Sequence, residues 1–192
     1  MCKLLLENGA SLDALQAFTS SMDLKRRSRL LDPLITRCLD NGSTSVYIVV
    51  LRFLVSIVLG INDGENGNGL SSQSMMKVAI DMSHDLAVRA IIHLEPWVLV
   101  VVDATGRTPL VYATIKHQEA ICKLLLEKGA SVEPLKSFTG SMDLKAKSEL
   151  LDQSLKNAMM EGLRSETVIR LLLLMALGGD RKSTRLNSSH VD

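Results

Sequence analysis

One stretch of the chain, Asp103–Val132, constrains the fold more than any other. It opens with a tight turn, followed by Thr108, which is suited to cap a helix, and by Pro109 at the first helical position. A short apolar helix pattern follows, a break comes at His117, and a second helix pattern ends at Gly129. A turn and two short helices in about thirty residues cannot bury their own apolar face, so such a unit must stack on neighbours.

The same stretch resembles the ankyrin repeat, whose pattern runs D-x-x-G-x-T-P-L-H-x-A, then G-H, then L-L-x-x-G-A. Two places depart from it: Val111 stands where the family has histidine, and His117 with Gln118 replaces Gly-His. Loss of the family's histidine is expected to weaken the hydrogen bonds between neighbouring loops. The residues that match the pattern are Asp103, Gly106, Thr108, Pro109, Leu110, Ala113, Leu124, Leu125, Gly129 and Ala130.

A long internal duplication indicates that the chain is built from several units. Residues 1–15 repeat 121–135, and residues 17–32 repeat 137–152, at an offset of 120 that pairs Cys2 with Cys122. The chain would therefore begin inside the second helix of a repeat, which predicts that Met1 is not the native start. Thr19–Ser21 and their counterparts, residues 139–141, are interpreted as caps of a short extra helix.

The resemblance implies an all-α fold, an ankyrin-type solenoid of stacked helix-turn-helix repeats with short hairpin loops and inserted linkers. Only 3% of the residues are aromatic, which suits thin, closely stacked helix layers. The expected segments are a partial repeat with its second helix only (1–15), an inserted linker or helix (16–32), a degenerate repeat (33–62), a Gly-rich loop (63–73), a degenerate repeat (74–102), the clear repeat (103–135), a second insert (136–152), a degenerate repeat (153–179) and a non-native tail (180–192).

Two apolar runs raise the question of a membrane segment. Residues 46–59 are almost continuously apolar, but the run is shorter than the roughly 20 residues that a span needs, and Arg52 lies in its middle. The run at 168–177 fails the same length test. Both are predicted to be buried helices, and no membrane contact is expected. A membrane protein whose cytosolic repeats precede its spans is the alternative that these runs keep open.

The run Pro96–Val102 is rich in β-branched residues and leads into the turn at Asp103, which predicts extended backbone. One interpretation is an exposed strand that anchors a partner through Trp97, because tryptophan is enriched at interface centres. The other is a hairpin finger buried against an inserted helix. The second is slightly favoured.

Little in the sequence supports catalysis. His84, His93 and His117 fall in different units, and no nucleophile or carboxylate has motif spacing to them. His84 and His117 occupy inter-helix breaks and are expected to bond loop carbonyls. The sequence therefore predicts no catalytic residues, no cofactor, no metal and no small-molecule substrate.

Charge and cysteine content constrain the partners and the compartment. A net charge of +1 gives no general reason to expect nucleic acid. The basic cluster Lys25–Arg27 with Arg29 is interpreted as a solvated helix face, with a localisation signal or an acid-binding patch as the alternative. Three cysteines form no disulfide framework, and the first ten residues lack the long apolar run and cleavage site of a signal peptide. Both features predict an intracellular protein in the cytoplasm, or alternatively in the nucleus.

The family resemblance implies a non-catalytic scaffold for protein–protein interaction, whose partner is another protein. Ankyrin arrays recognise partners with their hairpin tips and with the exposed face of each first helix. Carried onto this sequence, these positions are Ala104, Thr105 and Arg107 at the tip, and Ile115 and Lys116 on the helix. Arg107 is the strongest single candidate, because a guanidinium binds carboxylates through two nitrogens.

The two ends of the sequence suggest a fragment of a longer protein. Residues Asp180–His190 read DRKSTRLNSSH, which resembles a common sequencing-library adapter translated in frame, so the tail is set aside. If the native chain continues, the repeats are alternatively the regulatory arm of a larger enzyme, of an NTPase or signalling protein, or of a membrane channel.

Overall fold

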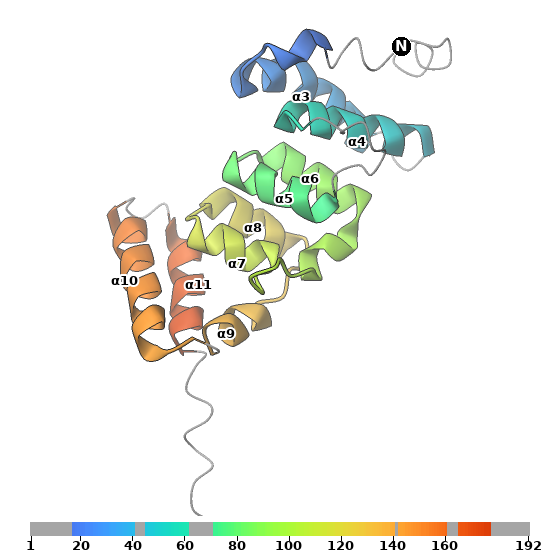
Figure 1. The fold of residues 1–192 in the computed structure, drawn as a ribbon. Helices are drawn as coiled ribbons and strands as arrows, with labels where there is room; N and C mark the ends of the chain where they lie inside the picture. Colours follow the sequence, from blue (N-terminus) through green and yellow to red (C-terminus); the bar gives the residue numbers. More distant parts are fainter. Residues whose placement is uncertain (1–16, 41–44, 62–70, 141, 161–164, 178–192) are drawn as a thin grey trace, which may run out of the picture. The chain divides into compact units, whose positions relative to one another are not determined.

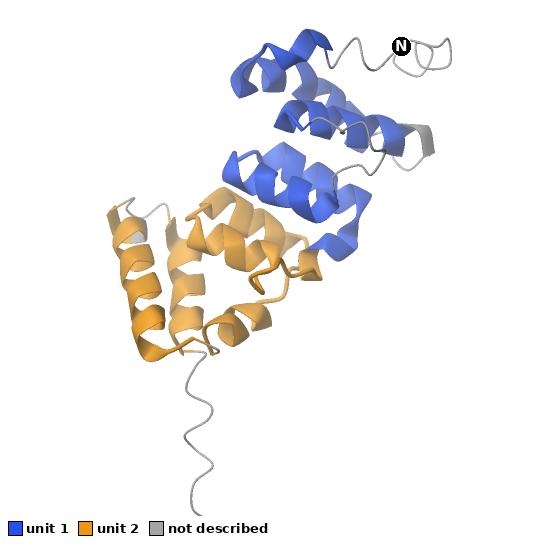
Figure 2. Cartoon of the chain, viewed as in Figure 1, with its two compact units in different colours: residues 1–98 blue, residues 99–192 orange. Residues whose placement is uncertain are grey.

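The structure is a computed structural model, and it describes residues 17–40, 45–61, 71–140, 142–160 and 165–177. The chain forms two compact units, residues 1–98 and 99–192 (Figure 2). Within the described residues every regular element is a helix, so the expected all-α fold is confirmed (Figure 1). The predicted partial repeat at 1–15 and the tail at 180–192 lie outside the described residues.

The first unit is built from α3 (Leu24–Asp40), α4 (Ser45–Leu59), α5 (Ser72–Asp81) and α6 (Asp85–Leu94). Helix α3 packs against α4 and α6, and α5 packs against α4 and α6. Each helix turns an apolar stripe inward, since buried side chains recur at helical spacing. The largest fully buried ones are Leu31, Ile35, Leu51, Leu59, Met76, Ile80 and Ile91.

Helix α3 corrects the expected segmentation. It runs unbroken from Leu24 to Asp40, so the short extra helix and the first helix of the 33–62 repeat are one helix, with Pro33 inside it. The caps were also misplaced: residues 17–20 are themselves helical, and Asp23 accepts the Arg26 amide at 2.8 Å. The start of α5 at Ser72, capped by the Ser71 hydroxyl, likewise shortens the expected loop at 63–73.

Helix α4 carries the long apolar run, and the first unit buries it. Val50, Leu51, Leu54, Val55, Ile57, Val58 and Leu59 are all at most 6% exposed. The Arg52 guanidinium binds the Glu95 carboxylate at 2.7 Å. Among the described residues, none of the helices has the length and apolarity to cross a membrane. The buried-helix interpretation of residues 46–59 is therefore confirmed from Val50 to Leu59, where Arg52 and Phe53 are half-buried and the rest are buried, whereas Ile48 and Val49 are 43% and 63% exposed.

The extended backbone expected for residues 96–102 is wrong for residues 96–100. Pro96–Val100 forms a 3-10 helix, η1, in which the Val98 amide donates to the Glu95 carbonyl at 3.0 Å. Proline favours the first position of a helix because its φ is already fixed near the helical value. The helix buries Val98 and Leu99 while Trp97 and Val100 remain exposed. Because its residues are helical, η1 forms neither the anchor strand nor the hairpin finger.

The second unit contains α7 (Pro109–Ile115), α8 (Glu119–Glu127), α9 (Glu133–Gly140), α10 (Leu144–Met160) and α11 (Glu166–Leu177). Helix α7 packs on α8, and α11 contacts all four of the others. The Thr139 hydroxyl of α9 donates to the Met175 carbonyl of α11 at 2.6 Å. The largest fully buried side chains are Leu110, Ile121, Leu125, Leu135 and Leu172.

The helices α3 and α10, which begin in the two halves of the duplication, adopt the same local structure. Helices α3 and α10 each have 17 residues and start 120 residues apart, at Leu24 and Leu144. Asp143 accepts the Ala146 amide at 2.6 Å, as Asp23 does for Arg26. Helix α10 therefore also joins the predicted insert at 136–152 to the first helix of the segment at 153–179. Thus Asp143, and not residues 139–141, caps it.

The breaks at Ser83 and His117 are the same joint, 34 residues apart. Both residues have left-handed backbone, with φ of 54° and 58°. The amide after each one reaches back five residues, from His84 to the Ala79 carbonyl at 2.9 Å and from Gln118 to Ala113 at 3.0 Å. This pattern closes a helix while reversing the chain. The predicted breaks at both places are confirmed.

Candidate functional site

Asp103 organises residues 103–107 of the second unit, called here the tip loop. Its Oδ1 accepts from the Thr105 amide at 2.8 Å, the Thr105 hydroxyl at 2.5 Å and the Arg107 amide at 2.9 Å. The Asp103 amide donates to the Arg107 carbonyl at 2.9 Å, and Gly106 completes the turn with φ of 76°. One carboxylate thus holds the backbone of the whole loop.

The same contacts determine the charge of this carboxylate. Partial burial by itself raises the pKa of Asp103, but hydrogen bonds from Thr105 and Arg107, together with the guanidinium charge of Arg107, outweigh it and lower the pKa to about 2. The Arg107 Nε lies 3.3 Å from Asp103 Oδ2 and 2.5 Å from the Thr105 hydroxyl oxygen. The loop therefore anchors Arg107 through its Nε. The hydrogen bonds between Arg107 and other described side chains do not use its two terminal nitrogens.

Tyr112 connects the tip loop to α7. The Arg107 guanidinium carbon lies 5.4 Å from the centroid of the Tyr112 ring, and the Lys116 ammonium nitrogen lies 5.5 Å from it. Both cations are held over an aromatic ring by its electron-rich face. Tyr112 itself is buried, at 7% exposure. No sequence motif assigns Tyr112 a role, although its i, i+4 spacing to Lys116 indicates a shared helix face.

The predicted partner-binding residues fall on both units. Ala104, Thr105 and Lys116 are exposed, whereas Arg107 and Ile115 are half-buried. Tyr112 brings Arg107 and Lys116 together, and Asp103 brings Thr105 to Arg107. Trp97, 53% exposed, lies in η1 within the first unit, so it is described apart from the tip residues.

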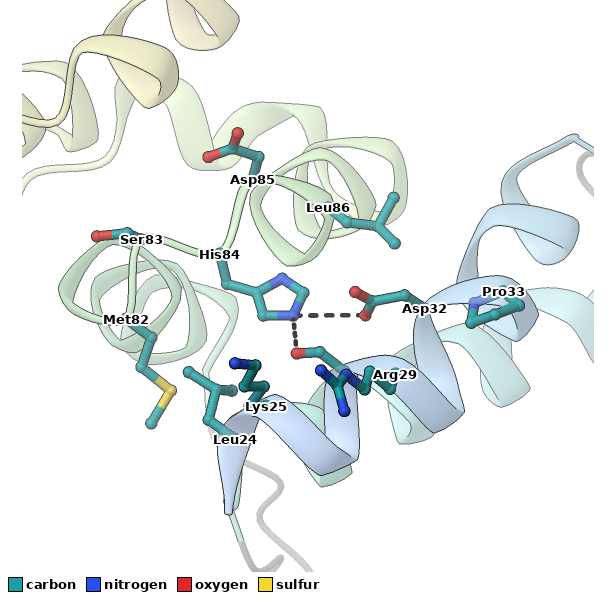
Figure 3. A pocket seen from close by; sticks show the side chains of 11 residues that line it. Leu24, Lys25, Arg29, Asp32, Pro33, Met82, Ser83, His84, Asp85 and Leu86 are labelled. Carbon is teal, nitrogen blue, oxygen red and sulfur yellow. Dashed lines mark hydrogen bonds and ion pairs between the residues drawn. The ribbon is translucent and has the colours of Figure 1, made fainter. Parts of the chain in front are cut away.

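The first unit contains an open groove of about 770 Å³ between α3 and the joint at Ser83 (Figure 3). His84 points into it, with its Nε2 2.8 Å from the Ser28 hydroxyl and 3.4 Å from Asp32 Oδ1. Ser28 and Asp32 lie one helical turn apart on α3, which places them on one face. Burial raises the pKa of Asp32, while the nearby His84 charge opposes the rise.

A serine, a histidine and an aspartate in contact invite comparison with a hydrolytic triad, but the geometry excludes that role. His84 Nδ1 accepts the Ala87 amide at 3.2 Å, so in the neutral ring the proton sits on Nε2. Both Ser28 and Asp32 face this same Nε2. A catalytic histidine needs its carboxylate at one nitrogen and a free lone pair toward the nucleophile at the other. The three residues therefore connect α3 to the joint between α5 and α6.

Neither break histidine has the bonding that the sequence predicted. His84 was expected to satisfy loop carbonyls; instead its ring accepts an amide as the N-cap of α6. The His117 Nδ1 is buried and has no hydrogen-bond partner among the described residues. The backbone joint places both side chains. The His84 side chain is buried there, at 8% exposure.

Of the basic cluster on α3, Lys25, Arg26 and Arg29 are exposed, as a solvated face requires. Arg27 differs, because its Nη1 donates to the Ile57 carbonyl near the end of α4 at 3.1 Å. A Cβ at Gly60 would stand 2.2 Å from this nitrogen, so glycine is needed there for the arginine to approach. Arg27 is therefore part of the packing of α3 on α4.

Other reactive groups are few in the described part of the chain. No group of three or more His, Cys, Asp or Glu side chains is placed to hold a metal ion there. Cys38 and Cys122 are buried and are not joined in disulfides. Burial raises the pKa of Cys122 to about 12, opposed by the hydrogen bond between this thiol and the Thr114 hydroxyl, so the thiol stays protonated at neutral pH and is a poor nucleophile.

The comparison with protein families matches one segment. Residues 105–135 match the family described as ankyrin repeat, and they contain most of the tip loop together with α7 and α8. Comparisons with curated proteins and with solved structures found no match. The resemblance seen in the sequence is therefore confirmed for this segment, whose confirmed features include the Thr108 cap, Pro109 at the first helical position and the Gly129 terminus.

Proposed function

Residues 105–135 form an ankyrin repeat, a module of protein–protein interaction, and on this basis we propose that the protein is a non-catalytic scaffold that binds another protein. The binding surface is formed by Ala104, Thr105, Arg107, Ile115 and Lys116. By the same proposal, the flanking degenerate segments are further repeats of this kind. The joint shared by Ser83 and His117 supports this for the segment at 74–102, because it gives both segments the same helix reversal.

The observation that carries the proposal is the pair of cations over Tyr112. Arg107 and Lys116 place two positive charges beside the exposed tip, and Asp103 fixes the Arg107 side chain through Nε. A guanidinium held in this way has lost part of its side-chain entropy before any partner arrives, which lowers the cost of binding. The preferred partner group is a carboxylate, which the terminal nitrogens of Arg107 bind in parallel.

The intracellular location belongs to the same proposal. Cys38 and Cys122 are buried and are not joined in disulfides. Buried cysteines outside disulfides suit a reducing compartment, where no disulfide is needed for stability. The cytoplasm is the proposed location, with the nucleus as the alternative.

The test selects displayed peptides against the purified protein and measures their dissociation constants for variants. Lys116→Glu is expected to weaken binding at least tenfold. Arg107→Lys keeps the charge but loses the planar fork, so it should also weaken binding, by a smaller factor. Lys145→Ala, at an 86% exposed side chain on α10, is the matched control and should change nothing. Selected peptides that bind all variants equally would refute this surface.

A further inference from the structure

A second surface lies in the first unit, outside the ankyrin repeat at 105–135. Phe18, Met22, Arg26, Arg29 and Leu30 line an open hollow of about 370 Å³, called here the Phe18 hollow. Two segments build it: the helical residues 17–20 and the first two turns of α3. The Asp23 cap and the bond from the Met22 amide to the Thr19 carbonyl, at 3.0 Å, fix the turn between them.

The hollow presents apolar side chains to solvent. Phe18 is 61% exposed and Leu30 is 43% exposed. Thr19, next to Phe18, is 1% exposed, so the backbone of this segment is held against the unit while the phenylalanine ring is not. Exposed aromatic and aliphatic side chains gathered around a concavity mark a place where another apolar group gains by burial.

Two arginines edge this apolar surface. Arg26 and Arg29 are exposed and lie one helical turn apart on α3, and none of the lining residues is acidic. Arg29 also lines the groove around His84 (Figure 3). An apolar concavity with a purely cationic edge is complementary to an apolar side chain flanked by carboxylates.

The second half of the duplication shows that the fold does not require this edge. Asp143 caps α10 as Asp23 caps α3, yet Ala146 and Glu149 stand where the first half has Arg26 and Arg29. Phe138, the counterpart of Phe18, is half-buried. The same backbone framework therefore exists without the two arginines and without the exposed phenylalanine.

We propose that the Phe18 hollow is a docking site for an acidic segment of a partner protein that carries a bulky apolar side chain. The apolar side chain enters between Phe18, Met22 and Leu30, and the flanking carboxylates bind Arg26 and Arg29. This surface goes beyond the proposed function, since it uses none of the residues of the tip loop or of α7.

The experiment measures binding of a labelled peptide in which leucine and phenylalanine alternate with glutamates. The probe is titrated into the full chain and followed by fluorescence anisotropy. Arg26→Ala with Arg29→Glu, which installs the residues of the second half, is expected to weaken binding at least tenfold. Phe18→Ser should weaken it by a similar factor, because the apolar and charged contacts act together. Far-UV circular dichroism of each variant checks that the helices are retained.

The matched control is Lys128→Glu with Lys145→Ala, which lowers the net charge by the same amount at exposed positions. It should leave binding unchanged. A probe with lysines in place of the glutamates should not bind. The proposal is overturned by an equal loss in the control, which would mean general charge attraction. It is also overturned by no effect of Phe18→Ser, which would mean that the arginines bind the carboxylates without any apolar contact. Failure of the wild-type chain to bind the probe overturns it as well.

The result is separable from the test of the tip surface. Lys116→Glu leaves the Phe18 hollow untouched, so it should not change the affinity for the acidic probe by more than the control does. Loss of binding in Lys116→Glu alone would assign the probe to the tip and remove the support for the hollow.

Discussion

Ser83 and His117 both adopt left-handed backbone. At the position of His117 the ankyrin pattern has glycine. A side chain in this region brings its Cβ close to the backbone, at a cost of about 1–2 kcal/mol. Both are retained because the amide-to-carbonyl bonds that reverse the chain need this conformation. The cost at His117 is increased by the buried Nδ1, which has no partner among the described residues.

We expect His117→Gly to raise the free energy of unfolding by about 0.5–1 kcal/mol, since relief of the Cβ strain exceeds the extra entropy of glycine in the unfolded chain. Urea unfolding followed by circular dichroism measures the change. His117→Ala separates the causes, because it removes the ring and keeps the Cβ. An equal gain in His117→Ala would assign the cost to the ring nitrogen and contradict the backbone explanation.

The Asp103 carboxylate makes the tip loop sensitive to acid. Its pKa of about 2 lies below the usual 3.8, so the folded protein binds this proton more weakly than the unfolded chain does. The stabilisation is complete above pH 4 and is lost as the pH falls toward 2. Asp103→Asn should lower the free energy of unfolding by roughly 1–2 kcal/mol at pH 6, and the gap to the wild type should shrink as pH falls below 4.

Urea unfolding at a series of pH values between 6 and 3 measures this gap. Glu149→Gln is the control, because its side chain is 69% exposed on α10 and it holds no loop together. A gap for Asp103→Asn that stays constant over the series would show that the carboxylate charge does not hold the loop.

At the scale of elements, one carboxylate joins the repeat to the last helix. Glu119, the first residue of α8, accepts the Thr167 amide at 3.0 Å and the Val168 amide at 2.8 Å, both in the first turn of α11. Burial raises the pKa of Glu119, but bonds from Thr167, Val168 and Lys123 outweigh it and lower the pKa overall. The carboxylate satisfies amides that a helix start leaves without partners.

Glu119→Ala should therefore lower the free energy of unfolding of the second unit by about 2 kcal/mol, since two charge-assisted hydrogen bonds and a favourable helix-dipole contact are lost. Hydrogen exchange measured by NMR should show faster exchange of the Thr167 and Val168 amides. Glu119→Asp keeps the charge but is too short to reach both amides, so it should behave like the alanine variant. Full protection in Glu119→Asp would mean that charge alone stabilises α11.

Some helices could be predicted from the sequence and others could not, for physical reasons. Helices α7 and α8 were predictable because their signals are local: the Thr108 hydroxyl, Pro109 and Gly129 mark the ends within the segment itself. Helix α3 was divided in two because Pro33 usually ends a helix. Its packing on α4 and α6 keeps the helix continuous. Residues 96–100 form the 3-10 helix η1 because β-propensity reflects packing within a sheet, and the described residues form no sheet that this run could join.

At the scale of the whole molecule, the sequence predicted the residues of the tip surface but not the groove around His84. The tip residues are close in sequence, so a repeat pattern locates them. Ser28 and His84 are 56 positions apart and meet only because α3 packs on α6. Their convergence depends on tertiary packing, which a single sequence does not encode as a motif. The i, i+4 spacing of Ser28 and Asp32 was the one local signal.

The left-handed joints at Ser83 and His117 also have a practical consequence. The reversal between two helices is fixed by main-chain bonds over a few residues, while the side chains there differ between the two copies. The joint therefore fixes the direction of the chain but not the identity of the side chains. A fluorophore or a spin label attached at Ser83, which is exposed, would report on the protein without disturbing the helices on either side.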